Sequence, residues 1–337
     1  MMSITPLLTL LSEGKLRTAV KANALYKPFY TLVYLATLKN CGLMDRLSSG
    51  PAPFNDLVMT YTSDIKTKDA LESWLQMGCR LKLLVVTDQG YVLTGLAEKL
   101  SQPQNDATLA LLQEVGSLHY RLITETPERI GKGELWQLDN QDGSLTARSS
   151  RALEPFVLEA IKRYLPHSKP CKLLEIGCGS GIYIRHAAEH NPLLTAVGLE
   201  LQEDVAQVAR KNLHDWGISD RVAIDIGDIR TMPVTPHFDV ATLHNNIYYF
   251  AVDERIQILD RIRGFLKPDG TLLLTTCCQG GNIGMEALNL WGASNLHGGR
   301  LPEKMEMIDQ LQQAGYADIN SMRLIPGDSF YAFSARK

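Results

Sequence analysis

Leu173-Leu174-Glu175-Ile176-Gly177-Cys178-Gly179-Ser180-Gly181 is the stretch that decides the fold. An apolar strand ends in an acidic residue, and three glycines follow at alternate positions before a helical pattern begins at Ile182. Glycine has no Cβ, so the backbone can turn sharply here and approach a ligand closely. The start of the next helix offers free N–H groups. The stretch therefore predicts a strand, a tight turn and a helix that bind a polar, partly anionic molecule.

The spacing of the glycines narrows the choice of ligand. A dinucleotide-binding turn has the pattern G-x-G-x-x-G, which would require a glycine at position 182, where Ile182 stands. The pattern E-x-G-x-G-x-G resembles motif I of the class I S-adenosylmethionine-dependent methyltransferases. This resemblance implies that Gly177, Cys178, Gly179 and Gly181 face the methionine part of that cofactor. A tight β–α turn without a ligand, as in any α/β protein, is the alternative.

Composition excludes several classes of protein. The chain has 337 residues, 45% hydrophobic and 21% charged, with a net charge of −3, so we expect a globular protein of two domains rather than a nucleic-acid binder. Its six cysteines show no ligand spacing such as C-x-x-C, which predicts reduced thiols, a cytoplasmic location and no metal site. No apolar stretch reaches the roughly 18 residues that a membrane-spanning helix needs.

The first hundred residues differ in pattern from the rest. Helical periodicity predicts helices over 25–39, 53–61 and 67–77, and two short apolar runs between 81 and 94 predict a hairpin. Three helices followed by a hairpin is the order of a winged helix. We therefore predict a winged-helix-like domain over 1–100, a helical linker over 101–150 and a cofactor-binding domain over 151–337.

A winged helix suggests either DNA binding or protein association. The helix that would enter DNA mixes lysines with acids, which favours association (Lys66 and Lys68 against Asp64, Asp69 and Glu72). An apolar surface on the first helix also favours association (Tyr30, Val33, Tyr34 and Leu35). The run Tyr91–Thr94 followed by Ala97 resembles the wing of small-molecule O-methyltransferases. That resemblance implies a homodimer whose N-terminal domain closes over the acceptor substrate.

Strand and helix patterns alternate from residue 150 onward, which predicts a parallel sheet with helices on both faces. We expect strands at 171–176, 195–200, 221–226, 238–243 and 270–277, and helices at 151–165, 181–190, 203–216, 252–265 and 302–314. The end of the chain, 319–335, predicts an antiparallel hairpin. The fold class is therefore α/β: a Rossmann-like sheet, parallel except for a C-terminal hairpin, with a mainly helical N-terminal domain. Class I methyltransferases have a sheet of this kind.

Two further segments match the cofactor site that the resemblance implies. Glu200 ends the second predicted strand and Leu201 follows it, at a place where a carboxylate can accept hydrogen bonds from both ribose hydroxyls. Gly227-Asp228-Ile229 follows the third strand, and the resemblance places its aspartate at the adenine amino group. Glu175 would bind the amino group of the methionine part. The alternatives are a surface acid that opens a helix for Glu200 and a turn-forming Gly-Asp pair for Asp228.

The fourth strand leads into His244-Asn245-Asn246-Ile247-Tyr248-Tyr249-Phe250. Many small-molecule O-methyltransferases carry a catalytic histidine just after this strand, and here Tyr248 or Tyr249 stands at its position. His244 is either a substitute general base or, with Asn245, part of the cofactor site. His297 is a second candidate base. If neither acts, the acceptor must be acidic enough to react by positioning alone.

The cofactor motifs and the layout resemble the small-molecule O-methyltransferases of pigment and antibiotic synthesis over nearly the full length. The resemblance implies transfer of a methyl group from S-adenosylmethionine to a hydroxyl of an aromatic or heteroaromatic small molecule. C- or N-methylation, an NAD-dependent oxidoreductase and a winged-helix regulator with a degenerate cofactor domain remain alternatives.

Overall fold

The computed structural model describes residues 5–62 and 64–337, so residues 1–4 and 63 of the predicted N-terminal domain lie outside it. The chain divides into two compact units. The N-terminal unit comprises Met1–Tyr120 and Ser144–Ala152, and the C-terminal unit comprises Arg121–Gly143 and Leu153–Lys337. Among the described residues, no helix combines the length and apolar character needed to cross a membrane.

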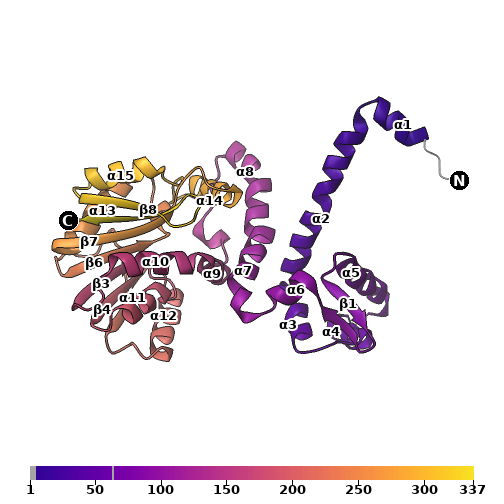
Figure 1. Ribbon diagram of the computed structural model, residues 1–337, viewed down its shortest axis with the longest axis horizontal. Helices are drawn as coiled ribbons and strands as arrows, with labels where there is room; N and C mark the ends of the chain where they lie inside the picture. Colours follow the sequence, from indigo (N-terminus) through magenta and orange to yellow (C-terminus); the bar gives the residue numbers. More distant parts are fainter. Residues whose placement is uncertain (1–4, 63) are drawn as a thin grey trace. The chain divides into compact units, whose positions relative to one another are not determined.

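Helices dominate the N-terminal unit, as predicted. Its elements are α1 (Thr5–Ser12), α2 (Lys15–Asn40), α3 (Leu43–Ser48), α4 (Phe54–Tyr61), α5 (Lys68–Arg80), β1 (Leu84–Thr87), β2 (Gly90–Leu93), α6 (Gly95–Leu100) and α7 (Asp106–Glu114), with α9 (Gly143–Ser149) joining from later in the chain (Figure 1). The predicted hairpin forms in antiparallel register, with Thr87 opposite Gly90. Helix α2 begins ten residues before the predicted start because its helical pattern continues through Pro28 toward Lys15.

A seven-stranded sheet forms the C-terminal unit, in the order β5-β4-β3-β6-β7-β9-β8. The strands are β3 (Cys171–Ile176), β4 (Leu194–Glu200), β5 (Val222–Ile226), β6 (Phe238–His244), β7 (Leu266–Cys277), β8 (Ala317–Arg323) and β9 (Phe330–Arg336). The first five are parallel, and β9 pairs antiparallel with both β7 and β8. The predicted fold class is confirmed, including the C-terminal hairpin.

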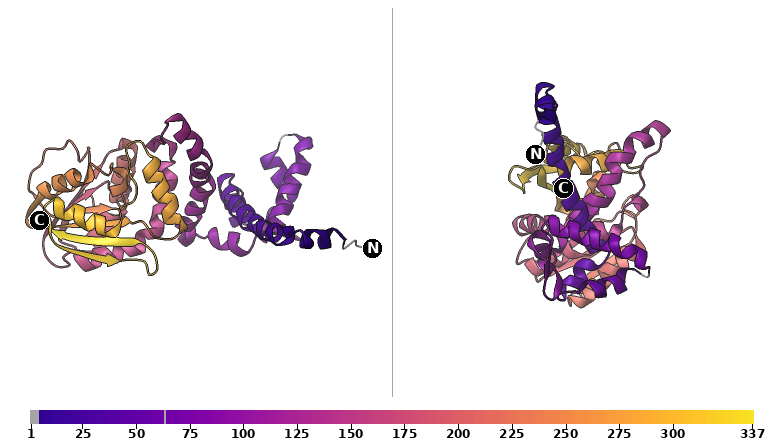
Figure 2. Two further views of the ribbon diagram at one scale, coloured as in Figure 1. Left: turned by 90° about the horizontal axis from the view of Figure 1, so that it is seen from above. Right: turned by 90° about the vertical axis from the view of Figure 1, so that its right-hand side faces the viewer.

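Helices cover both faces of this sheet (Figures 1 and 2). The helices of the C-terminal unit are α8 (Tyr120–Lys132), which lies beyond the end of the sheet in Figure 1, and α10 (Glu154–Tyr164), α11 (Ile182–His190), α12 (Glu203–Asp215), α13 (Arg255–Phe265), α14 (Ile283–Ser294) and α15 (Lys304–Gln313). Leu173 packs in one core with α10, α11 and α12, and its neighbour Leu174 packs in another with α13 and α15. Neighbouring strand residues point to opposite faces, so every central strand is apolar on both sides.

The stretch from Thr126 to Ser149, within the predicted helical linker, contains glycines and polar residues, yet it is anchored in the interior of the C-terminal unit. Helix α8 continues to Lys132, and Trp136 is fully buried. The Trp136 ring lies 6.3 Å from the ring of Trp291, and its indole N–H donates to the Thr126 hydroxyl at 3.1 Å. A single large aromatic residue anchors the segment, because burying its surface outweighs the polar composition around it.

Candidate functional site

All three glycines of the turn after β3 adopt left-handed backbone conformations, with φ of 65° at Gly177, 53° at Gly179 and 78° at Gly181. Only glycine adopts these angles without a steric cost. Gly181 caps the N-terminus of α11, and the N–H of Gly177 donates to the carbonyl of Leu199 at 2.8 Å. The predicted strand, turn and helix are therefore present, and the turn is joined to the end of β4.

The space around two of these glycines differs. A Cβ added to Gly177 would lie 2.5 Å from the side-chain nitrogen of Asn246, whereas a Cβ at Gly179 would meet no atom within 4 Å. The turn is therefore packed from behind by Asn246 and faces open space at Gly179. A ligand can therefore approach the backbone closely at Gly179, as the glycine pattern predicts.

Glu200 ends β4 and holds the turn from the side. Its carboxylate accepts hydrogen bonds from the backbone N–H groups of Gly179 at 3.0 Å, Leu201 at 2.9 Å and Gln202 at 3.2 Å. Carboxylate oxygens have about four lone-pair sites between them, so capacity remains for a ligand hydroxyl. The predicted residues Glu200 and Leu201 thus come together with the glycine turn.

Glu175 lies on β3 beside that carboxylate and is buried, with 2% of its surface exposed. Burial, and then the neighbouring charge of Glu200, raises the pKa of Glu175 well above its usual value. Both effects disfavour the ionised form, so a cationic group beside Glu175 would be needed to stabilise it. An amino group is the ligand feature that this environment favours.

Three consecutive residues, the last of β6 and the two that follow it, leave buried polar atoms without a partner among the described residues. These atoms are the Nε2 of His244 and the side-chain oxygens of Asn245 and Asn246. Asn246 is held in place because its amide nitrogen donates to the Ile176 carbonyl at 2.7 Å, next to the glycine turn. Buried polar atoms are normally paired, so this segment fits a polar ligand at the same edge of the sheet.

His244 is buried at the end of β6, with 6% of its surface exposed. Its Nδ1 lies 3.0 Å from the Thr275 hydroxyl on β7, and the ring of Tyr183 packs edge-on at 5.1 Å. Burial lowers the pKa of His244 to about 3. The imidazole is therefore neutral across the physiological range.

The third predicted cofactor segment follows β5. The N–H of Gly227 donates to the Glu200 carbonyl at 2.9 Å, which joins this segment to the end of β4. Asp228 accepts two hydrogen bonds from the Arg230 side chain and one from its backbone N–H. Burial raises the pKa of Asp228, but these bonds to Arg230 outweigh it, so the pKa lies below its usual value. Ile229 is buried in the core of the sheet.

The candidate catalytic residues divide into two environments. Tyr248 is 4% exposed and packs in the core, with its ring 4.8 Å from that of Tyr249. The Tyr248 carbonyl accepts from the N–H of Gly299 at 2.9 Å, so the segment that carries His297 lies against these tyrosines. His297 itself is exposed, and its backbone N–H donates to the Asn295 side-chain oxygen at 3.1 Å. Among the described residues, no hydrogen bond or ion pair joins the side chains of His297 and His244.

Sequence reasoning missed Thr275 and Tyr183, the two side chains that surround His244. Thr275 lies in the apolar run of β7, and Tyr183 lies in the first turn of α11. A threonine near the carboxyl end of β7 could have indicated a hydrogen-bond partner for His244. This inference requires the strand order, which places β7 beside β6.

Known proteins provide an independent comparison. Residues 174–272 match the model of a methyltransferase domain. The malonyl-[acyl-carrier protein] O-methyltransferase of Halalkalibacterium halodurans is 28% identical over 116 residues, which are 34% of this chain and 42% of that protein. The chain thus spans less than half the length of this curated relative.

Solved structures match over almost the whole chain. Mitomycin 7-O-methyltransferase MmcR has a TM-score of 0.79 at 18% identity and covers 97% of this chain and 100% of its own. PigF, solved with SAH, has a TM-score of 0.76 at 17% identity and covers 94% of this chain and 99% of its own. The C-terminal unit therefore has the fold of the class I methyltransferases, and residues 174–272 within it match the model of a methyltransferase domain.

Proposed function

We propose that this protein transfers a methyl group from S-adenosylmethionine to a hydroxyl of an aromatic or heteroaromatic small molecule, leaving S-adenosylhomocysteine. One observation carries the proposal. The left-handed glycine turn opens at Gly179, and the Glu200 carboxylate and the unpartnered atoms of 244–246 lie at the same edge of the sheet. The methyltransferase match covers these elements from β3 to β7.

The residues present fit this cofactor. Glu175 would bind the amino group, Glu200 and Leu201 the ribose, and Asp228 with Gly227 and Ile229 the adenine. Cys178 and the three glycines form the turn beneath the methionine part. When bound, the cofactor supplies an electrophilic methyl group on a sulfonium. The contribution of this chain is to align that methyl with the acceptor oxygen and to exclude water.

Proton removal from the acceptor is a separate question. A base catalyses best when its pKa lies near the working pH, and burial holds the pKa of His244 near 3. We therefore favour His297, Tyr248 or Tyr249 at the acceptor, or an acceptor whose own hydroxyl is acidic. At this finer level we propose an acceptor of the prodigiosin type. The run from His244 to Phe250 resembles that pathway's O-methyltransferase, whose hydroxy-bipyrrole carbaldehyde has a hydroxyl acidified by conjugation.

N- or C-methylation by the same site remains a second proposal, because nothing in the cofactor half selects the acceptor atom. The cofactor residues, by contrast, give a direct test. Calorimetric titration with S-adenosylhomocysteine should show micromolar binding, with NAD in parallel showing none. Gly179→Ala should abolish the binding, because its Cβ would occupy the open space and its φ is 53°.

Gly217→Ala is the matched control for that variant. Gly217 has a φ of 68° and open space around a Cβ, but it follows α12 and is not one of the residues proposed to bind the cofactor. It should therefore carry the same backbone cost and keep full affinity. Binding of NAD alone, or equal loss of affinity in both variants, would contradict the proposed cofactor site.

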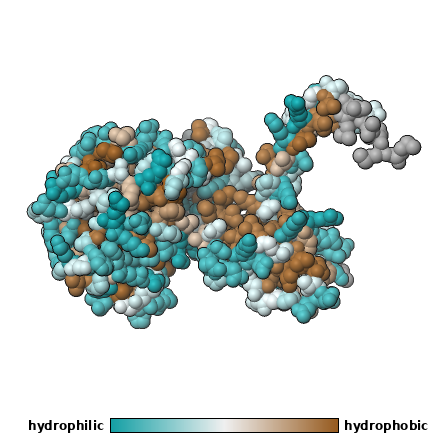
Figure 3. Space-filling model, in the orientation of Figure 1, coloured by the Kyte–Doolittle hydropathy of each residue, from teal (hydrophilic) through white to brown (hydrophobic). Residues whose placement is uncertain are grey.

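We also propose that the protein forms a homodimer through the N-terminal unit. Brown residues lie along part of helix α2 in Figure 3. This helix exposes a row of large apolar and aromatic side chains (Val20 at 61%, Leu25 at 71%, Tyr26 at 53%, Phe29 at 49%, Tyr30 at 44%). Leu25, Phe29 and Val33 are spaced four apart and so share one face of the helix. A contiguous apolar face of this kind is typical of a protein interface.

A further inference from the structure

We propose that His244 carries its proton on Nε2 and donates it in a hydrogen bond to the carboxylate of the bound cofactor's amino-acid end, with Thr275 as the positioning residue. The identity of that ligand rests on the function proposed above. The tautomer of His244 does not rest on the proposed function, because it follows from the side chains of this chain alone.

Strand pairing brings the two side chains together. His244 on β6 lies directly opposite Thr275 on β7 in the parallel register, so both point to the same face of the sheet. Thr275 is fully buried, and its hydroxyl oxygen lies 3.0 Å from the Nδ1 of His244. The N–H of Asn245 donates to the Thr275 carbonyl at 2.6 Å and fixes the backbone beside the ring. The imidazole therefore has one defined orientation.

Counting protons selects the tautomer. Within residues 5–62 and 64–337, the Nδ1 of His244 is the one partner of the Thr275 hydroxyl. If Nδ1 carried the proton, the hydroxyl hydrogen would be buried without an acceptor. If the hydroxyl donates to Nδ1, its hydrogen is satisfied and the ring proton lies on Nε2. The second arrangement leaves a single unpaired donor, the Nε2–H, at a buried position without a protein partner.

The surroundings keep this form neutral. Burial is the cause that lowers the pKa of His244, and no charged group adds to it. The titratable side chain that packs on the ring is Tyr183 of α11, at 5.1 Å between ring centroids. A neutral imidazole with Nδ1 occupied offers one N–H donor and no free lone pair.

The neighbouring atoms indicate what this donor binds. The side-chain oxygens of Asn245 and Asn246 are unpartnered acceptors, and the buried Glu175 favours a cation. One donor beside several acceptors matches the carboxylate and the ammonium group of an amino acid. Asn246 also braces the glycine turn, so this group of atoms lies next to Gly177. The amino-acid end of S-adenosylmethionine has the required chemistry.

The tautomer can be tested in the free protein by NMR of ¹⁵N-histidine-labelled samples. The signal that His244→Gln removes should show a protonated Nε2 and an unprotonated Nδ1, unchanged between pH 5.5 and 8. Thr275→Val should change this pattern and Thr275→Ser should keep it. Thr276→Val, which removes an equally buried hydroxyl bonded to the Cys277 carbonyl, should have no effect. A proton on Nδ1, or titration within this range, would overturn the proposal.

The contact with the carboxylate is tested by calorimetry with two probes. S-Adenosylhomocysteine has the amino-acid end, and 5′-methylthioadenosine lacks it. His244→Leu should weaken binding of the first about tenfold or more and leave the second unchanged. His244→Gln should retain much of the affinity, because its amide can donate but cannot act as a base. Equal effects on both probes, or equal affinities for the two variants, would refute the contact.

The experiments distinguish a failure of the proposed cofactor site from a failure of the proposed tautomer of His244. If the unchanged protein bound neither probe, the proposed cofactor would be wrong and the carboxylate contact with it, while the NMR pattern would still decide the form of His244.

Discussion

At the scale of single residues, two glutamates beside the turn after β3 have the same carboxylate group but different roles. Glu175 and Glu200 end neighbouring strands, yet their surroundings differ. The Glu200 carboxylate has three backbone N–H partners, and that of Glu175 is buried beside it. One carboxylate therefore supports the turn, while the other is costly to ionise until a cation approaches. This residue-scale asymmetry gives a testable dependence on pH.

We predict that Glu175→Gln stabilises the ligand-free protein at pH 7 to 8. The pKa of Glu175 is raised in the folded state, so the folded state binds a proton more tightly than the unfolded state. Stability then falls as pH rises above the unfolded value of about 4.3 and toward the raised folded value. Thermal unfolding between pH 5 and 8 should show this decline in the unchanged protein and a smaller one in the variant, with a gain on the order of 1 kcal/mol at neutral pH.

The same variant should bind S-adenosylhomocysteine less well, because a neutral amide attracts an ammonium group weakly. Glu200→Gln is the informative comparison: it removes a carboxylate with three N–H partners and should destabilise the protein. A Glu175→Gln variant that is less stable than the unchanged protein at pH 8 would disagree with this account.

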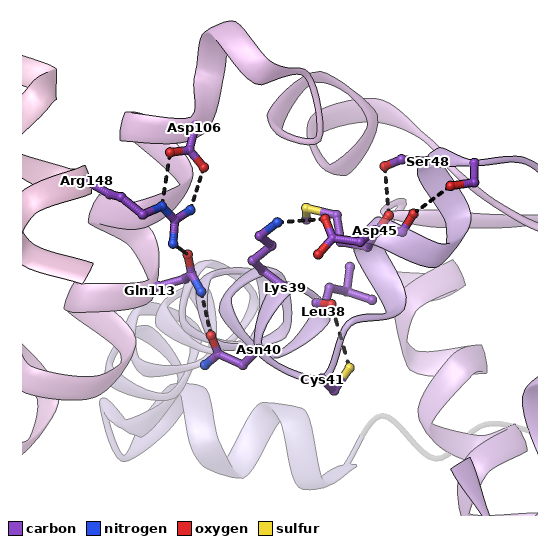
Figure 4. A network of polar contacts seen from close by, with 11 residues as sticks. Leu38, Lys39, Asn40, Cys41, Asp45, Ser48, Asp106, Gln113 and Arg148 are labelled. Carbon is purple, nitrogen blue, oxygen red and sulfur yellow. Dashed lines mark hydrogen bonds and ion pairs between the residues drawn. The ribbon is translucent and has the colours of Figure 1, made fainter. Parts of the chain in front are cut away.

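At the scale of elements, a polar network holds α9 within the N-terminal unit (Figure 4). Arg148 of α9 donates to the Asp106 carboxylate through two nitrogens, at 3.0 and 2.5 Å. It also contacts Gln113 of α7, whose amide donates to Asn40 at the end of α2 at 2.5 Å. Helices far apart in sequence are thus joined by a bidentate ion pair and an amide hydrogen bond. A bidentate pair fixes the relative orientation of the two side chains and also stabilises the contact.

We predict that this network weakens in acid. The hydrogen bonds from Arg148 lower the pKa of Asp106 in the folded state, although burial opposes them. Such a carboxylate contributes stability above its unfolded value of about 3.9, and that contribution is lost as pH falls toward the lower folded value. Asp106→Asn should cost about 0.5 kcal/mol near pH 7, a small effect because the pair is partly exposed.

Denaturant unfolding at pH 7 and at pH 3 provides the measurement. The difference between the unchanged protein and Asp106→Asn should be present at pH 7 and shrink at pH 3. Asp45→Asn is the control within the same unit, since the Asp45 side chain is 64% exposed and pairs with Lys39 at the surface. A loss that stays constant with pH would show that the carboxylate charge of Asp106 does not contribute.

At the scale of the whole molecule, the proposed homodimer depends on the apolar face of α2. Replacing Leu25 and Phe29 of α2 with glutamate should shift the protein toward monomers, because each large apolar side chain contributes about 1.5–3 kcal/mol when buried. Sedimentation equilibrium of the full chain is the measurement. Met59→Glu changes an equally large, 77% exposed side chain on α4 and should leave the assembly intact. A monomer at tens of micromolar before any substitution would rule the interface out.

Much of this molecule follows from local patterns. The glycines at alternate positions required left-handed backbone, and Gly177, Gly179 and Gly181 all have it. Strands β3 to β7 lie within a few residues of their predicted bounds, because short apolar runs that alternate with longer helical patterns are typical of buried parallel strands. Trp136 was missed since nothing near it in sequence indicates that Trp291 is its partner.

The sequence by itself determined the fold class and the conformation of the glycine turn, because those features depend on backbone angles and on apolar spacing along the chain. Only the tertiary structure decided the state of His244. Its neutral form depends on burial, and its tautomer depends on Thr275, 31 residues away on the neighbouring strand. Proton positions follow from the surroundings in space, and those surroundings exist only after the strands have paired.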